Sequence, residues 1–95
     1  MLNLKELLKQ EKEIWIRVEK SEKKRFLTLL KEQNVKWIDG QEINVEKDKI
    51  SYFMGVNSNF ELGFVSPMCW CSNIKNNTKK KYEFKELLNM EELNV

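Results

Sequence analysis

The side chains that carry most enzymatic chemistry are sparse in this chain of 95 residues. It contains no histidine, so it lacks the usual proton-transfer group at neutral pH, the base of Ser-His and Cys-His pairs, and the commonest metal ligand. Carboxylates at Asp39, Glu42, Glu46 and Asp48 could in principle hold a metal ion, but they fall in a turn and loop where solvated acidic residues are expected. The three glycines have no phosphate-loop spacing. We therefore expect no catalytic residues, no metal and no cofactor.

The two cysteines, Cys69 and Cys71, are separated by one residue. They could supply thiolates for zinc or for redox chemistry, but a structural zinc site takes four ligands, and the chain has no further cysteine or histidine. On an extended segment they would point the same way without easily forming a disulfide with each other. We expect two small, partly buried side chains beside Trp70. Such sparse cysteine usage indicates a cytoplasmic protein rather than a disulfide-stapled secreted one.

The best local cluster of positive charge follows the cysteines. It comprises five lysines and one tyrosine that could stack on a base: Lys75, Lys79, Lys80, Lys81, Lys85 and Tyr82. The cluster could contact phosphates or an acidic protein surface, although charge runs in loops are usually only solvated. The formal net charge is only +2, too small to attract nucleic acid or a membrane from a distance, so any such binding must be local.

Met68 and Trp70 form an apolar, aromatic segment directly after Pro67. They belong either to the core or to an exposed anchor of the kind that dominates protein interfaces. Trp15 presents a similar choice, because it lies on the strand face opposite its apolar neighbours. The candidate protein-binding residues are Met68, Trp70, Lys79, Lys80 and Lys81.

Periodicity predicts the elements that must position these residues. In the first half we expect a short helix over residues 3–10, a strand over 14–19 with alternating apolar residues, and a main helix from Glu22 to Gln33. Asn34 is a plausible left-handed stop for that helix. A second extended segment over 35–38 ends in the Asp39-Gly40 turn.

The second half predicts a hairpin between positions 49 and 65 with its turn at 57–59, then a polar exposed loop over 73–81. An edge strand over 81–84 and a terminal helical turn close the chain. The sequence thus indicates one α+β domain over residues 1–95: a small antiparallel or mixed sheet of three to five strands, packed on one main helix, with short N-terminal and C-terminal helices.

The order of these segments resembles small α/β proteins carried by phages and prophages of low-GC bacteria. The resemblance rests on the Trp37-Ile-Asp-Gly40 turn and the closing Tyr82-Glu-Phe-Lys-Glu-Leu-Leu88, and it covers most of the chain. These motifs are structural, so the resemblance implies no catalytic residue. The chain departs from the pattern between Ser66 and Lys81, where we expect its individual function to reside.

Phage accessory proteins of this kind commonly bind host machinery, and inhibitors of CRISPR-Cas systems are a prominent class among them. The resemblance therefore implies a non-catalytic inhibitor that occupies the surface of a host defence complex, such as a CRISPR-Cas effector. DNA mimicry is disfavoured by the net charge of +2. The alternative is a nucleic-acid-binding phage accessory protein that uses the lysine cluster. No membrane association is expected, since no apolar run approaches the roughly 20 residues that span a bilayer.

Overall fold

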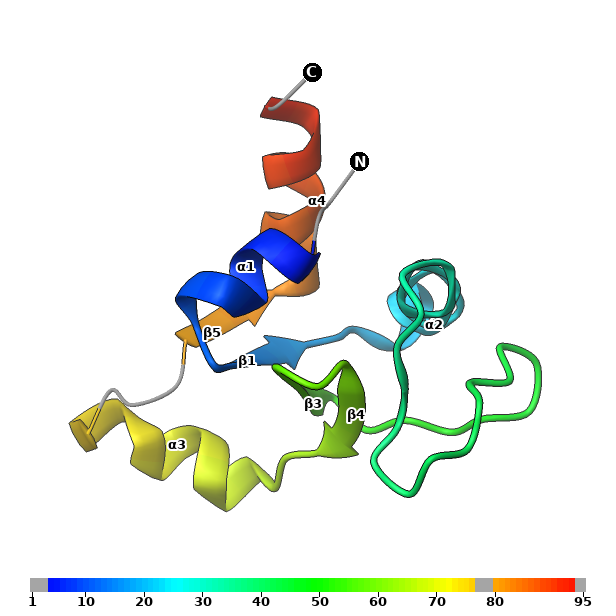
Figure 1. Cartoon of the computed structure of the whole chain (residues 1–95). Coiled ribbons are helices and arrows are strands. Elements are labelled where there is room, and N and C mark those ends of the chain that lie inside the picture. The colour runs from blue at the N-terminus through cyan, green and yellow to red at the C-terminus, as the bar shows by residue number, and fades with distance from the viewer. Residues whose placement is uncertain (1–3, 77–79, 94–95) are drawn as a thin grey trace.

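The computed structural model describes residues 4–76 and 80–93, without the side chains of residues 10, 72–76, 80 and 89–93. A five-stranded mixed sheet carries several short helices (Figure 1), which confirms the predicted α+β class. In chain order the elements are α1 (Leu4–Gln10), β1 (Glu13–Arg17), the 3-10 turn η1 (Lys20–Glu22), α2 (Lys23–Glu32), β2 (Lys36–Trp37), β3 (Phe53–Asn57), β4 (Glu61–Phe64), α3 (Pro67–Asn76), β5 (Lys80–Glu83) and α4 (Phe84–Leu93).

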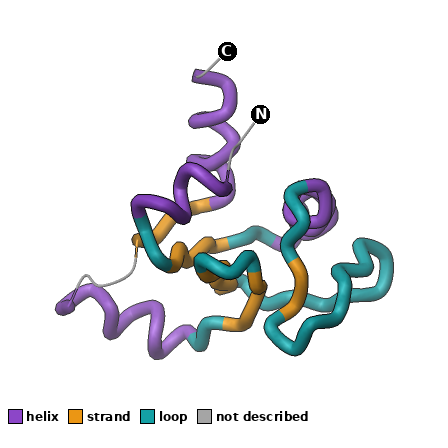
Figure 2. The backbone as a smooth tube through the Cα atoms, viewed as in Figure 1, coloured by secondary structure: helices purple, strands orange, loops and turns teal. Residues whose placement is uncertain are grey.

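The strand order across the sheet is β2-β4-β3-β1-β5. The two inner pairs, β1 with β3 and β3 with β4, are antiparallel, whereas the outer pairs, β1 with β5 and β2 with β4, are parallel. Because β5 lies at one edge, the predicted C-terminal edge strand is confirmed. Figure 2 shows α3 on one side of the strands and α1 and α4 on the other.

One face of the sheet carries the main core. The alternation predicted for β1 is confirmed, since Ile14 and Ile16 are buried and pair with the buried Val56 and Met54 of β3. Three helices complete this core with residues that are almost fully buried: Leu4, Leu8, Phe26, Leu27, Leu30, Phe84 and Leu87. The prediction of one main helix therefore holds only loosely, because α1, α2 and α4 share the packing. An edge-to-face contact between Phe26 and Phe84, with centroids 5.4 Å apart, joins α2 to α4.

The turn signals around α2 and β2 act as predicted. Asn34 follows α2 in the left-handed region with φ of 64°, and Gly40 adopts φ of 90° in the turn after β2. The segment between β2 and β3 is tied down at two points. Ile43 is buried in the core, and the Asp48 carboxylate accepts hydrogen bonds from the Asn44 backbone N–H at 2.7 Å and from Trp37 Nε1 at 2.6 Å. Among the described residues, no helix combines the length and apolar character needed to cross a bilayer.

The segment after the hairpin differs from the prediction of a polar loop over residues 73–81. Helix α3 extends through residue 76, and β5 begins at residue 80. Ser66 begins the helix, because its Oγ accepts a hydrogen bond from the backbone N–H of Cys69 at 3.0 Å. Pro67 occupies the first helical position, where its missing N–H costs nothing. Ser66 and Pro67 thus start a helix at the point where strand β4 has ended.

Candidate functional site

On the face of the sheet opposite the main core, the strand register aligns two rows of residues across β1, β3 and β4. One row is polar, and the other contains two glycines. Trp15 of β1 lies opposite Gly55 of β3, and Gly55 lies opposite Gly63 of β4. One wide aromatic side chain is therefore followed by two positions without a side chain. In the adjacent row Glu13 lies opposite Asn57, whose Nδ2 donates a hydrogen bond to Glu61 at 3.0 Å.

Helix α3 covers the β1 and β5 side of this face with Trp70. The Trp70 ring packs on Trp15 with centroids 6.3 Å apart and on Phe53 with centroids 4.9 Å apart. The Lys81 ammonium lies 5.4 Å from the centroid of the Trp70 ring, and it donates a hydrogen bond to the Trp70 carbonyl oxygen. Trp70 is therefore part of a second aromatic layer, outside the main core and only partly exposed.

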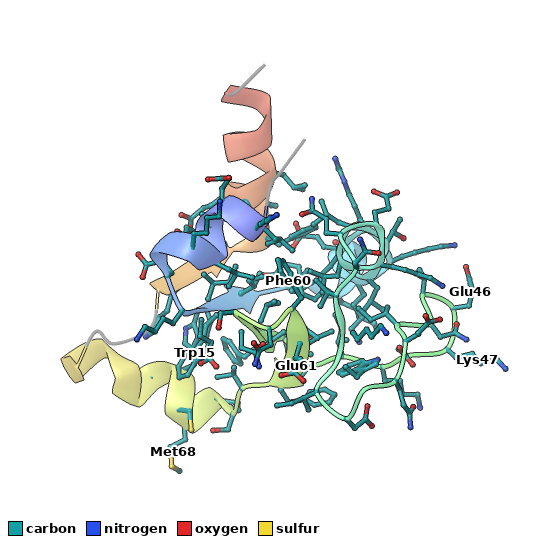
Figure 3. All side chains as sticks on the ribbon, viewed as in Figure 1. Trp15, Glu46, Lys47, Phe60, Glu61 and Met68 are labelled. Carbon is teal, nitrogen blue, oxygen red and sulfur yellow. The ribbon has the colours of Figure 1, made fainter. Side chains whose placement is uncertain are left out.

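A groove of about 210 Å³ lies beside this layer, over β3 and β4. Gly55 and Gly63 belong to its floor, and Trp15 and Cys69 flank it on the α3 side. Ile38 and Phe64 line it as well, and both are strongly exposed. Phe64 keeps one ring face on Trp37, with centroids 5.5 Å apart. Figure 3 shows Trp15 between β1 and α3, with Glu61 on β4.

Two carboxylates, each fixed by a hydrogen bond, form the polar end of the groove. Glu13 accepts a hydrogen bond from Trp15 Nε1 at 2.8 Å. Glu61 is fixed by Asn57 across the hairpin turn, because Asn57 Nδ2 donates to its carboxylate and Asn57 Oδ1 accepts the Glu61 backbone N–H at 3.1 Å. These bonds orient two negative charges at one end of an otherwise apolar groove.

The predicted protein-binding residues are only partly brought together. Met68 is 80% exposed and points away from the sheet (Figure 3), whereas Trp70 and Lys81 pack against each other. Lys79 lies outside the described residues. Lys80 is described only by its backbone in β5.

The predicted nucleic-acid-binding cluster is divided by the sheet. Tyr82 pairs with the buried Ile16 and packs on the main core, so it faces away from Lys81, its neighbour in β5. Burial raises the Tyr82 pKa, and the nearby carboxylates of Glu11 and Glu86 raise it further. Lys85 is exposed on α4. Lys75 belongs to α3, and its side chain lies outside the described set.

The cysteines differ from expectation in both exposure and direction. Cys69 and Cys71 are exposed rather than partly buried, and they lie on a helix rather than on an extended segment. Residues two apart on a helix do not face each other, so the pair does not present two thiols to one ion. Within the described part of the chain, no group of three or more potential ligand side chains is placed to hold a metal.

The sequence did not single out the residues that form the groove. The local pattern around Gly55, Gly63, Glu61 and Phe64 predicts a hairpin and no more. An isolated glycine inside a strand pattern is a known signal for a bulge or for the close approach of another group, and this hairpin contains two of them in register.

Comparison of the chain with protein-family models, with curated proteins and with solved structures found no match.

Proposed function

We propose that this chain is a non-catalytic binding protein of phage origin that inhibits a host defence complex by occupying its surface. A CRISPR-Cas effector is the leading candidate target. The phage origin and the choice of target rest on the sequence resemblance, whereas the mode of action rests on the groove face. By groove face we mean the groove together with its exposed apolar rim, Ile38 and Phe64.

The observation that carries the proposal is the clustering of exposed apolar side chains around a concave surface. Ile38, Phe64 and Met68 are 64%, 63% and 80% exposed. The first two line the groove, whereas Met68 projects from α3 away from the sheet (Figure 3). Single exposed apolar residues are ordinary on protein surfaces, but an apolar rim around a hollow is typical of an interaction site. Binding would bury this rim.

A catalytic role has less support. The chain has no histidine, and the carboxylates of the groove are held by Trp15 and Asn57. The groove thus offers shape and charge for recognition.

The test measures binding to purified CRISPR-Cas effectors and the inhibition of their DNA cleavage. We expect the doubly substituted variant Ile38→Ser with Phe64→Ser to lose both, because the apolar rim is removed. Tyr52→Ser is the matched control, since Tyr52 is a 50% exposed aromatic residue that does not line the groove. Equal inhibition by the double variant and the wild type would reject the groove face as the working surface.

The nucleic-acid alternative makes a different prediction about salt. Binding through lysine contacts to phosphates weakens steeply as salt rises, whereas an apolar protein interface changes much less. A direct measurement of DNA and RNA binding at low and moderate salt therefore separates the two functions.

A further inference from the structure

Gly63 has no structural reason to be glycine. A Cβ built at this position meets nothing within 4 Å, and Gly63 is not among the residues in the left-handed region. Glycine inside a strand is destabilising by roughly 0.5–1 kcal/mol relative to alanine. The absence of a side chain at Gly63 deepens the groove, because Gly63 forms part of its floor.

The size of the groove favours a side chain of a partner protein over a small-molecule ligand. Its volume of about 210 Å³ falls below the roughly 300–1,000 Å³ of typical small-molecule pockets. Three large apolar side chains, Trp15, Ile38 and Phe64, are in its lining. A single long side chain with an apolar stem matches this space.

The carboxylates of the groove indicate that the partner side chain should end in a positively charged group. Glu13 and Glu61 lie at its polar end, on either side of Asn57 in the strand register. Lys36 is the register partner of Glu61, yet among the described residues no ion pair neutralises the Glu61 carboxylate. A carboxylate has about four acceptor sites, so Glu61 can accept more than the bond from Asn57.

We propose that the groove floored by Gly55 and Gly63 binds an arginine side chain presented by the partner protein, with its stem over Gly63 and its guanidinium between Glu13 and Glu61. Arginine fits better than lysine because its planar group presents several donors in a fixed fork that suits carboxylates. This inference rests on the proposed function, since it names the chemistry that the target must present.

The test uses a short probe, acetyl-Gly-Arg-Gly-amide, titrated into the ¹⁵N-labelled chain and followed by NMR. We expect saturable shifts of the Gly55 and Gly63 amides and of the Trp15 indole N–H. The same peptide with citrulline, the neutral isostere of arginine, should not produce them. Glu61→Gln should weaken binding about tenfold, as expected for the loss of a charge-assisted hydrogen bond, whereas Glu42→Gln, an exposed glutamate outside the groove, should leave it unchanged.

Gly63→Val tests the space itself. The Cβ of the new side chain meets nothing within 4 Å, and its methyl groups would occupy the groove. The variant should therefore fold, as its NMR spectrum will show, and should no longer bind the probe. The proposal is overturned by the absence of saturable shifts, by equal binding of the citrulline peptide, or by unchanged binding to the valine variant. Self-association of the wild type that Gly63→Val abolishes would instead assign the groove to a second copy of this chain.

These outcomes are distinct from those of the effector assay. If the chain inhibits an effector but ignores the probe, the arginine site is wrong and the proposed function stands. If it binds the probe but inhibits no effector, the groove chemistry is right and the proposed target class is wrong.

Discussion

The indole of Trp70 on α3 stacks on the indole of Trp15 on β1, with ring planes 22° apart. The two residues come from distant parts of the chain, and their contact holds α3 against the second face of the sheet. Trp15 also bounds the groove. The same contact therefore both packs α3 on the sheet and supports one side of the candidate site.

This stack predicts a measurable coupling between the two tryptophans. Trp70→Ala should lower the free energy of unfolding by about 2 kcal/mol, less than for a fully buried tryptophan because Trp70 is partly exposed. Trp15→Ala combined with Trp70→Ala should cost about 1 kcal/mol less than the sum of the single changes. Urea denaturation of the three variants measures this cycle, and strictly additive effects would contradict the stack.

The two paired glycines should respond differently to alanine. Gly63→Ala should stabilise the chain by roughly 0.5–1 kcal/mol, because the new methyl group meets open space while the unfolded chain loses freedom. Gly55→Ala should give no such gain, because its Cβ would lie 3.2 Å from both Trp15 Cδ1 and Val65 Cγ2. Thermal unfolding of both variants is the measurement, and equal shifts in Tm would show that the two sites are equally open.

Asp48 should make stability depend on pH in the acid range. The hydrogen bond from the Asn44 backbone lowers the Asp48 pKa, and the bond from Trp37 lowers it further. A depressed folded-state pKa means that the unfolded chain takes up the proton first, so this stabilisation is complete above about pH 4 and is lost as pH falls through the lower folded value.

Asp48→Asn is the variant that isolates this contribution. It should be less stable than the wild type by about 1 kcal/mol near neutral pH. This is below the roughly 1.5–3 kcal/mol typical of hydrogen bonds to a charged group, because Asp48 is partly exposed and asparagine keeps an acceptor oxygen. The difference should shrink as pH falls below about 4 and through the lowered pKa of folded Asp48, where the carboxyl group becomes neutral. Urea titrations across this range measure it, and a difference that does not change with pH would show that the charge of Asp48 contributes nothing.

Substitutions at Asn34 test whether its left-handed backbone conformation stabilises the end of α2. Its φ of 64° is tolerated by asparagine and glycine but strained for a β-branched residue. Asn34→Val should therefore lose about 1–2 kcal/mol, whereas Asn34→Gly should stay within about 0.5 kcal/mol of the wild type. Chemical denaturation compares the two, and similar losses would place the effect in the asparagine side chain rather than in the backbone.

The sequence predicted the elements whose signals are local. Alternation of Ile14 and Ile16 identified β1, and Asn34 marked the end of α2, because side-chain period and capping act over a few residues. Ser66 and Pro67 carry the same kind of local signal for the start of α3, although the sequence prediction placed a polar loop over residues 73–81, which include the last part of that helix.

The groove could not be predicted in the same way, because it depends on register between strands. Gly55 and Gly63 become one floor only when β3 and β4 pair at that offset, and Trp15 borders it only because β1 joins on the other side. The sharing of the core among three helices is likewise set by long-range packing, such as the contact between Phe26 and Phe84.

The parallel pairing of β1 with β5 has a consequence for the order of folding. β1 leaves α1 near the start of the chain, yet its second neighbour arrives only with residues 80–83. Closing so long a loop is entropically costly, so this pair should form late. Until it does, the edge of β1 is an open template for strands of other chains, and fragments that end before β5 should aggregate where the longer chain remains monodisperse.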